Sequence, residues 1–544
     1  MWEFTSIRGL NHAVRGAETC ALRSEDLRTG EVCRDYGFDV GQPLADPPIH
    51  PAHRDVGLGR VERIHSFPSL HQLTFAFAFG GGRFVLEMDG RRDLLVTLHA
   101  AGPTPHVRHV LSTRHGEVEV RPGRRYEVTD GVREVAGGGR DVGAPATAPT
   151  PDLTAAEALR QCVYGNAVRA PGGQLYLPVN RAWVTMFGRM NGEGPGFAGP
   201  LLFIWDAAFG SVLAAHVDVD LALSNLRLLC AQLDDDGWWR QLRVGERTNN
   251  LTGLPVVSLA VQVLHERTGA DEIVREFYGP LLRANRWLRR HRDRNGDGLL
   301  EWGYEAAGRG LEVPGRWAPG YESGLDDSPM WEGEPVDEER RCFMASAVCL
   351  NAVHAYDCLL LSRFARLLGR GDDAQRLRAD CEESRRLVDA SLWDERRGLY
   401  ANRRWAGDFA EEVSPTSFFP LLAGIPGPER AARLSRHLDD ERTFGGEWRL
   451  PSVARSSRRF TAAGDYWRGR IWPPLNYLVR RGLRDYDPPA ADRLAADSRR
   501  LFLREWLEHG HVHENYRADT GYGEAPGSYY RSCPFYTWGG LLLL

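Results

Sequence analysis

The chain has 544 residues, of which 42% are hydrophobic and 26% are charged, with a formal net charge of −5. This length exceeds what one hydrophobic core usually serves, so we expect a large globular domain with a smaller companion. The slightly acidic balance offers no polybasic surface, which argues against nucleic acid or an anionic membrane as a partner.

The first twenty residues, MWEFTSIRGLNHAVRGAETC, lack the basic start, apolar run and small-residue cleavage site of a secretory signal. No stretch approaches the roughly 18 apolar residues of a membrane span. We therefore expect a cytoplasmic protein. Its nine cysteines are scattered without CxxC pairs, so we expect small buried thiols rather than disulfides or zinc ligands.

Residues 1–137 carry the pattern of β structure. HQLTFAFAF and RFVLEMDG alternate apolar and polar positions, and short strand patterns in GEVEV and RYEVTDG follow. The segment 138–152 is rich in Gly, Pro, Ala and Thr and predicts a linker. We predict a small N-terminal β-rich accessory domain ending before this linker.

From residue 153 to residue 544 the hydrophobic period becomes helical. One helix reads Ala374, Leu377, Cys381, Ser384, Val388 and Leu392, and the capping pair Asp372 and Asp373 opens it. Further helical patterns cover residues 207–233, 255–267, 272–292, 343–368, 428–438, 473–483 and 490–508. Such a mainly α domain suits an α-toroid of paired helices, although periodicity alone does not distinguish a toroid from a helical solenoid.

Four loop segments concentrate Trp, Asp, Glu and Arg beyond what packing needs. They are FIWDAAFG (203–210), GYESGLDDSPMW (320–331), GDYWRGRIWPPLNYL (464–478) and HENYRADTGYG (513–523). Pyranose rings offer an apolar face for aromatic stacking and hydroxyl groups for hydrogen bonds. Glycosidic cleavage needs one protonated carboxyl group and one ionised carboxylate. These segments therefore predict a sugar-cleaving site.

In this order, the four segments resemble the signature blocks of glycoside hydrolase family 63, including its mannosylglycerate and glucosylglycerate hydrolases, with a weaker similarity to trehalases. The resemblance covers about residues 200–540. It implies an (α/α)6 toroid and an inverting mechanism on a small carbohydrate. It places the general acid on Asp326 and the general base on Glu514, and no cofactor is required for this chemistry.

The same resemblance implies residues that hold the terminal sugar. A Trp-Asp pair matches Trp205 and Asp206, and a tryptophan wall matches Trp467, Arg468 and Trp472. The full set of candidate substrate-binding residues is Trp205, Asp206, Tyr321, Gly324, Trp467, Arg468, Trp472 and Trp538.

Each assignment has a structural alternative. Asp326 and the adjacent Asp327 precede a proline-containing turn and could cap a helix, and so could Asp206. Glu514 lies in a polar loop and could be a solvated surface carboxylate. The aromatic side chains could simply be core residues.

Other candidates also keep a second interpretation. Arg468 could pair with Asp465, and Trp538 could be C-terminal packing. Tyr321 and Glu322 flank the acid, and we expect them to orient it rather than to react.

The sequence RDRNGDGLLEW suggests a calcium site. Asp293, Asn295, Asp297, the Leu299 carbonyl and Glu301 supply oxygen atoms at the spacing of a calcium loop. The twelfth-position glutamate of an EF-hand is replaced by Tyr304, so the prediction is a structural calcium and not a sensor. The alternative is an Asn-Gly and Asp-Gly turn that needs no metal.

We therefore expect an inverting, exo-acting α-glycosidase, with glucose as the favoured sugar, that is a monomer or a small homo-oligomer. An alternative is a glucosylglycerate or mannosylglycerate hydrolase, although Tyr321 stands where that branch has tryptophan and NLTGLPVV (250–257) replaces its Gln-Pro-Pro loop. A non-catalytic sugar-binding relative and a phosphorylase are further alternatives, and the presence of Glu514 argues against both.

Overall fold

The computed structural model describes residues 201–509, 512–523, 532–533 and 536–544, together with separate segments between residues 21 and 179. The chain forms two compact units. The first comprises residues 1–198, 505–512 and 533–537, and the second residues 199–504, 513–532 and 538–544. The predicted linker lies outside the described residues as far as residue 150, so its boundaries stay a prediction.

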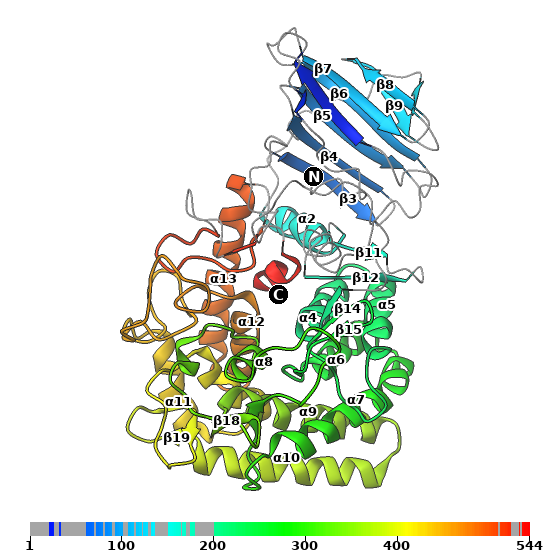
Figure 1. The fold of residues 1–544 in the computed structure, drawn as a ribbon. Helices are drawn as coiled ribbons and strands as arrows, with labels where there is room; N and C mark the ends of the chain where they lie inside the picture. The colour runs from blue at the N-terminus through cyan, green and yellow to red at the C-terminus, as the bar shows by residue number, and fades with distance from the viewer. Residues whose placement is uncertain are drawn as a thin grey trace. The chain divides into compact units, whose positions relative to one another are not determined.

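The first unit contains two antiparallel sheets, drawn in blue and cyan in Figure 1. One has the order β10-β9-β6-β5-β4-β3, with strands β3 (Val61–Ser69), β4 (Gln72–Phe79), β5 (Gly82–Asp89), β6 (Asp93–Ala101), β9 (Arg125–Val128) and β10 (Val132–Val135). The other has the order β2-β1-β7-β8, with strands β1 (Ala21–Asp26), β2 (Val32–Cys33), β7 (Val107–Thr113) and β8 (Gly116–Val120). The alternating patterns in HQLTFAFAF and RFVLEMDG correctly predicted β4 and β5. Helix α2 (Pro151–Tyr164) and the short strands β11 (Val168–Arg169) and β12 (Leu175–Tyr176) also belong to this unit.

The second unit is mainly α-helical, as predicted. Its helices are α4 (Ile204–Ala214), α5 (Val219–Cys230), α6 (Val257–Thr268), α7 (Asp271–Arg292), α8 (Ala318–Glu322), α9 (Val348–Leu367), α10 (Gly371–Ser391), α11 (Pro428–Ser435), α12 (Pro473–Leu483) and most of α13 (Pro488–His509). Its 3-10 helices are η3 (Pro329–Trp331), η4 (Pro415–Ala423), η5 (Arg436–Leu438) and most of η6 (Thr537–Leu543). Its short strands are β13 (Leu201–Phe203), β14 (Leu242–Val244), β15 (Arg247–Thr248), β16 (Glu301–Gly303), β17 (Val336–Asp337), β18 (Cys342–Ser346), β19 (Trp393–Asp394), β20 (Leu399–Tyr400) and β21 (Arg403–Arg404).

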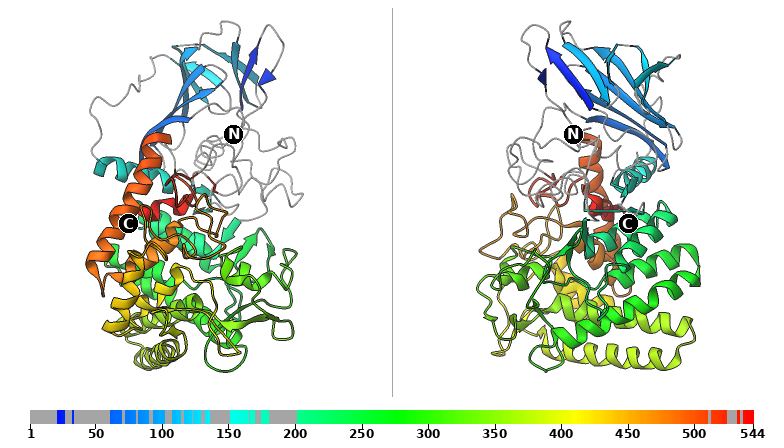
Figure 2. Two further views of the ribbon diagram at one scale, coloured as in Figure 1. Left: turned by 90° about the vertical axis from the view of Figure 1, so that its left-hand side faces the viewer. Right: turned by 45° about the vertical axis from the view of Figure 1, so that its right-hand side comes forward.

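Short connections join the helices in successive pairs, α4 to α5, α6 to α7, α9 to α10 and α12 to α13. A short connection makes two helices antiparallel neighbours. The chain therefore returns within each pair toward the end from which that pair started. Figure 1 shows these helices around a central region that contains α8, and Figure 2 shows the unit from two further sides.

The predicted apolar stripe of α10 is its buried face. Ala374, Leu377, Cys381, Ser384, Val388 and Leu392 are all buried. These positions recur every three or four residues, so one side of the helix packs against α9 while the other carries charge.

Two predicted helices are corrected by the structure. The pattern at 207–233 is interrupted, because Asp218 is extended and its Oδ1 accepts a hydrogen bond from Leu221 N at 3.0 Å, which begins α5 as a separate helix. The pattern at 343–368 begins too early, because Cys342–Ser346 is strand β18, paired with β16, β17 and β21.

Among the helices described, none combines the length and apolar composition that crossing a membrane requires. The cysteines with described side chains, seven in number, are free thiols.

Candidate active site

The loop between α8 and η3 carries Asp326 in a tight, internally bonded turn. Ser323 Oγ donates to Gly320 O at 2.6 Å and accepts from Leu325 N at 3.1 Å. Gly324 has φ +75°, and a Cβ there would lie 2.9 Å from Cζ2 of Trp205. Glycine is therefore required both by the left-handed backbone and by the close packing against the indole ring.

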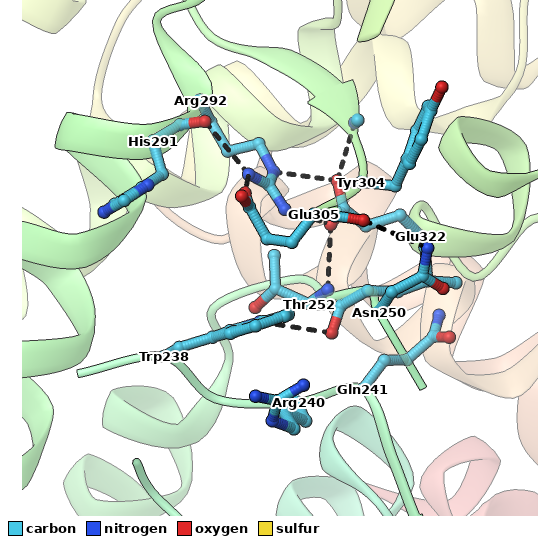
Figure 3. Close-up of polar contacts among 12 residues, drawn as sticks. Trp238, Arg240, Gln241, Asn250, Thr252, His291, Arg292, Tyr304, Glu305 and Glu322 are labelled. Carbon is cyan, nitrogen blue, oxygen red and sulfur yellow. Dashed lines mark hydrogen bonds and ion pairs between the residues drawn. The ribbon is translucent and has the colours of Figure 1, made fainter. Parts of the chain in front are cut away.

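The start of this loop is anchored by Glu322, whose side chain is fully buried. Arg292 Nη2 and Nε donate to its two oxygens at 2.5 and 2.9 Å, and the backbone N–H groups of Thr252 and Gly303 donate at 2.8 and 2.7 Å. Figure 3 shows Arg292 and Thr252 approaching this carboxylate. A buried ion pair with its remaining acceptor sites satisfied holds one geometry. Glu322 thus fixes the start of residues 323–328, the loop that carries Asp326 and that we call the acid loop.

Asp326 lies in a strongly acidic environment. Its pKa is raised well above the usual range, first by burial and then by the negative charges of Asp327, Glu514 and Asp206. Three of the four segments singled out from the sequence therefore bring carboxylates close enough to act on one another. A carboxyl group in this environment keeps its proton to a higher pH than a solvent-exposed aspartic acid does.

Asp327 has a different set of partners. Its Oδ1 accepts from Trp467 N at 2.9 Å and its Oδ2 lies 3.5 Å from Arg468 Nε. Arg468 also pairs with Glu332, and its backbone N–H donates to Asp465 O at 3.0 Å. Asp327 and Arg468 therefore link the acid loop to the segment 464–478.

Glu514 is buried, with 2% of its surface exposed, so it is not a solvated surface carboxylate. Tyr466 Oη donates to its Oε1 at 2.9 Å, and Trp538 Nε1 donates to its carbonyl oxygen at 2.8 Å. The loop is held by two backbone hydrogen bonds between Ile471 and Tyr516, at 2.7 and 2.9 Å. These contacts hold the carboxylate of Glu514 close enough to the acid loop for its charge to act on Asp326.

Four predicted tryptophans form one buried cluster with Glu514 at its edge. Trp467 and Trp472 stack with centroids 3.5 Å apart, Trp205 meets Trp538 edge-on at 5.3 Å, and Trp205 lies 6.2 Å from Trp467. All four are less than 9% exposed. The four rings pack on one another. Their positions fit core residues, and they also fit an apolar wall on which a sugar ring stacks.

The remaining predicted residues, Asp206 and Tyr321, lie close enough to Asp326 for their charges to interact. Asp206 is 5% exposed in the first turn of α4, and the N-cap of that helix is Phe203 rather than Asp206. Tyr321 is 42% exposed, and its carbonyl oxygen accepts a hydrogen bond from Gln241 Nε2. Its phenol has a raised pKa because of burial and then the charges of Asp326 and Asp327.

Sequence reasoning missed two supporting residues. Tyr466 has a φ of +52°, which is uncommon for a non-glycine residue and is often found at functional sites. Arg470 is 1% exposed and donates to Asn515 Oδ1 and to Gly523 O. Both belong to the segment GDYWRGRIW, whose crowding of Tyr, Trp and Arg was the available signal.

The predicted calcium loop forms a chain of turns. Gly298 N donates to Asp293 Oδ1 at 3.3 Å, Asp297 N to Asn295 Oδ1 at 3.1 Å and Leu299 N to Asp297 Oδ1 at 2.8 Å. Glu301 is fully buried and accepts from Arg294 N at 2.9 Å, and burial raises its pKa to about 8. In the described part of the chain, no group of three or more His, Cys, Asp or Glu residues is arranged to hold a metal ion.

Residues 199–538 match the family model described as the mannosylglycerate hydrolase MGH1-like glycoside hydrolase domain. The chain belongs to this family. This glycoside hydrolase is similar to the mannosylglycerate hydrolase of Thermus thermophilus, with 28% identity over 400 residues, 60% of this chain and 90% of that protein. It is also 28% identical over 376 residues to the glucosylglycerate hydrolase of Mycolicibacterium hassiacum, which covers 52% of this chain and 81% of that protein.

Two solved structures extend the comparison. A family 63 mannosylglycerate hydrolase from Thermus thermophilus in complex with glucose aligns with a TM-score of 0.52 and 26% identity, over 63% of this glycoside hydrolase and 92% of that chain. A bacterial glucoamylase in complex with acarbose aligns with a TM-score of 0.51 and 10% identity, over 97% and 88% of the two chains. The second likeness concerns the fold alone.

Proposed function

We propose that this glycoside hydrolase is an inverting, exo-acting α-glycosidase with Asp326 as general acid and Glu514 as general base. The observation that carries the proposal is the contrast between the two groups. Asp326 has its pKa raised by burial and by three carboxylates, whereas Glu514 accepts a hydrogen bond from Tyr466. One group suited to donate a proton and one suited to accept a proton are what single-displacement hydrolysis requires.

In the proposed reaction, Asp326 gives its proton to the glycosidic oxygen as the bond to the anomeric carbon breaks. Glu514 takes a proton from a water molecule, whose oxygen bonds to the anomeric carbon from the opposite face. The products are the free sugar with inverted configuration and the protonated leaving group, and exchange of one proton with solvent restores both carboxyl groups. The reaction needs no cofactor.

For the sugar, we propose contacts from the segments that surround the two carboxyl groups. Trp205, Trp467, Trp472 and Trp538 would form the apolar wall, Asp206, Arg468 and Tyr321 would meet hydroxyl groups, and Gly324 would allow the acid loop to approach Trp205. The proposal is supported by the tryptophan cluster beside Glu514 and by the charge of Asp206 acting on Asp326.

Two classes of substrate are candidates. The similarity to mannosylglycerate and glucosylglycerate hydrolases favours an α-glycoside of glycerate. A neutral α-glucoside is the second candidate, because Tyr321 and the segment 250–257 depart from the glycerate branch at positions outside the two carboxyl groups. We also propose that the second unit is an (α/α)6 toroid, which its antiparallel helix pairs support.

A structural calcium in the Asp293–Glu301 loop is a separate proposal. Its oxygen-rich composition supports it, but the same side-chain oxygens already accept hydrogen bonds within the loop. Thermal unfolding with excess chelator and with added Ca²⁺ tests it. Equal melting temperatures with chelator and with Ca²⁺ would contradict the calcium site and identify the loop as a turn that needs no metal.

The deciding experiment is a hydrolysis screen with α-glucosylglycerate, α-mannosylglycerate, kojibiose, nigerose and trehalose, in which proton NMR follows the first anomer released. Initial β-anomer supports inversion and identifies the substrate. From trehalose, inversion releases β-glucose and α-glucose in equal amounts, because the leaving glucose keeps its α configuration. Initial α-anomer from either glycerate glycoside, or from trehalose without an equal amount of β-anomer, would overturn the mechanism, and the absence of hydrolysis of all five would contradict both substrate classes.

A further inference from the structure

The segment that carries Glu514, residues 513–523, is tied at both ends to one buried arginine. Arg470 is 1% exposed. Its Nε donates a hydrogen bond to Asn515 Oδ1, and its Nη2 donates to Gly523 O. Asn515 directly follows Glu514, and Gly523 is the last residue of the segment. A planar guanidinium with five fixed donors therefore joins the two ends of this segment, which we call the base loop.

The backbone and the stem of Arg470 are also held in place. Its carbonyl oxygen accepts a hydrogen bond from Ser452 N at 2.8 Å, and the next residue, Ile471, pairs with Tyr516. Gly464 has φ +78°, and a Cβ at this position would collide with Cγ of Arg470. The stem thus packs against a backbone position that requires glycine. The guanidinium therefore reaches the base loop from a fixed backbone.

The charge of Arg470 lies in a region that otherwise disfavours an ionised Glu514. Glu514 is buried, and its charge and that of Asp326 act on one another. Burial and a neighbouring negative charge both favour the protonated form of a carboxyl group. A general base must instead be ionised before it can take a proton from water. The proposed mechanism therefore requires groups that stabilise the negative charge of Glu514.

Tyr466 is one such group, because its Oη donates to Glu514 Oε1 at 2.9 Å. The other acidic, basic and histidine side chains of the four segments that form the candidate site are Asp206, Glu322, Asp326, Asp327, Asp465, Arg468, Arg470, His513, Arg517 and Asp519.

This set contains three arginines, which differ in their contacts. Arg468 pairs with Glu332. Arg517 pairs with Asp519 at 2.6 Å. The hydrogen bonds of Arg470 are the ones that reach the residue next to Glu514, and their acceptors are a neutral amide oxygen and a neutral carbonyl oxygen. Arginine keeps its positive charge at every pH at which proteins are folded.

We propose that Arg470 is a positioning residue for the general base: its guanidinium holds the base loop, and its charge keeps Glu514 ionised. The inference rests on the proposed hydrolase function, because Arg470 acts through Glu514. The covalent geometry of adjacent residues places the two charges on the order of 10 Å apart. At an effective dielectric constant of about 20, unit charges at that separation shift a pKa by roughly one unit.

The test is the pH profile of kcat/KM for the substrate that the hydrolysis screen identifies. Arg470→Met removes the charge, so the acidic limb, which reports the ionisation of Glu514, is expected to move up by about one pH unit. Arg470→Lys keeps the charge and should move this limb less than half as far. Arg470→Gln should reproduce the shift with a polar side chain, and it replaces Arg470→Met if that variant does not fold.

Arg385→Met is the matched control. Arg385 is half-buried and also donates to a neutral oxygen, the carbonyl of Ala423, outside the candidate site. Its variant should leave the acidic limb in place. A lower kcat/KM in Arg470→Met without movement of the acidic limb would show that Arg470 has only a structural role and would overturn the proposal. An equal shift in Arg470→Lys and Arg470→Met would overturn it as well.

A measurement without turnover separates this inference from the hydrolase proposal. The carbon-13 signal of the Glu514 carboxyl group, identified by its absence in Glu514→Gln, reports the pKa of this group directly. That pKa should be about one unit higher in Arg470→Met than in the wild type. If no glycoside is hydrolysed but this difference is found, the proposed reaction fails and the role of Arg470 stands. Equal pKa values in the two proteins overturn the role of Arg470 itself.

Discussion

Asp326 and Asp327 are adjacent in the chain but differ in their partners. Asp327 accepts a hydrogen bond from Trp467 N and lies beside Arg468, while no side chain among the described residues donates a hydrogen bond to Asp326. The sequence alone left either residue able to cap a helix. Through these contacts Asp327 links the acid loop to the segment 464–478. Within the residues that the structure describes, the carboxyl group of Asp326 has no such contact and is available for proton transfer.

Replacing either proposed catalytic group by its amide tests that assignment. Asp326→Asn and Glu514→Gln are each expected to lower kcat by about 10²- to 10⁴-fold, the usual contribution of one general acid or base. Folding should persist, since the amides keep the shape of the carboxyl groups. Asp519→Asn, in the same loop as Glu514, is the control. A proposed catalytic variant with near-normal kcat would show that its residue has another role.

The charge of Asp327 should be visible in the pH profile. Burial and then this charge raise the pKa of Asp326, and activity on the alkaline side requires Asp326 to stay protonated. Asp327→Asn removes a negative charge, so the pKa of Asp326 falls and the alkaline limb of kcat moves to lower pH. The acidic limb belongs to the base and should move less. An alkaline limb that stays in place or moves upward contradicts the coupling.

At the scale of elements, the acid loop depends on one buried ion pair. Breaking such a pair by removing one partner leaves an uncompensated charge and costs about 3 to 5 kcal/mol. Arg292→Met should therefore lower the free energy of unfolding by about this amount in urea denaturation. Arg227→Met is the control, because its pair with Glu276 is exposed and such pairs contribute about 1 kcal/mol or less. Equal losses in the two variants would argue against a special role for Glu322.

The helices and strands that could be predicted are those whose pattern is contained in their own residues. The stripe from Ala374 to Leu392 predicts α10 because burial at helical spacing is visible in the residues themselves. The interruption at Asp218 was missed because an aspartate within an apolar helical pattern resembles a surface position. Strand β18 was missed because its partners come from three separate segments. Pairing between segments far apart in the sequence leaves no local period.

The residues of the candidate site also divide into those with a local signal in the sequence and those without one. Asp326 and Glu514 lie in recognisable segments, and both were named from the sequence. Glu322 was expected to orient the acid, but Tyr466 and Arg292 were not given roles, since their importance comes from partners that the sequence does not identify.

At the scale of the whole molecule, the helical core contains ionisable groups that do not belong to the candidate site. Asp357 on α9 is 4% exposed, and Asn285 Nδ2 on α7 donates to its Oδ2 at 2.7 Å. Burial raises its pKa from 3.8 to about 7, with that hydrogen bond opposing the shift. One turn earlier, burial lowers the pKa of His354 to about 4. The stability of the fold is therefore coupled to pH at its interior.

The sign of this coupling follows from proton binding. Between pH 4 and 7 the folded state keeps a proton on Asp357 that the unfolded state has released, so stability falls as pH rises through this range and levels off above it. Asp357→Asn removes the effect while preserving shape and the acceptor for Asn285. Relative to the wild type, the variant should gain about 1.4 kcal/mol of unfolding free energy per pH unit between pH 5 and 7, and no more above pH 8. Urea denaturation across this range measures the difference, with Asp380→Asn on the exposed face of α10 as the control. Because His354 is present in both proteins, its own titration cancels in the comparison. A difference that is constant with pH would mean that Asp357 is ionised in the folded protein at every pH tested.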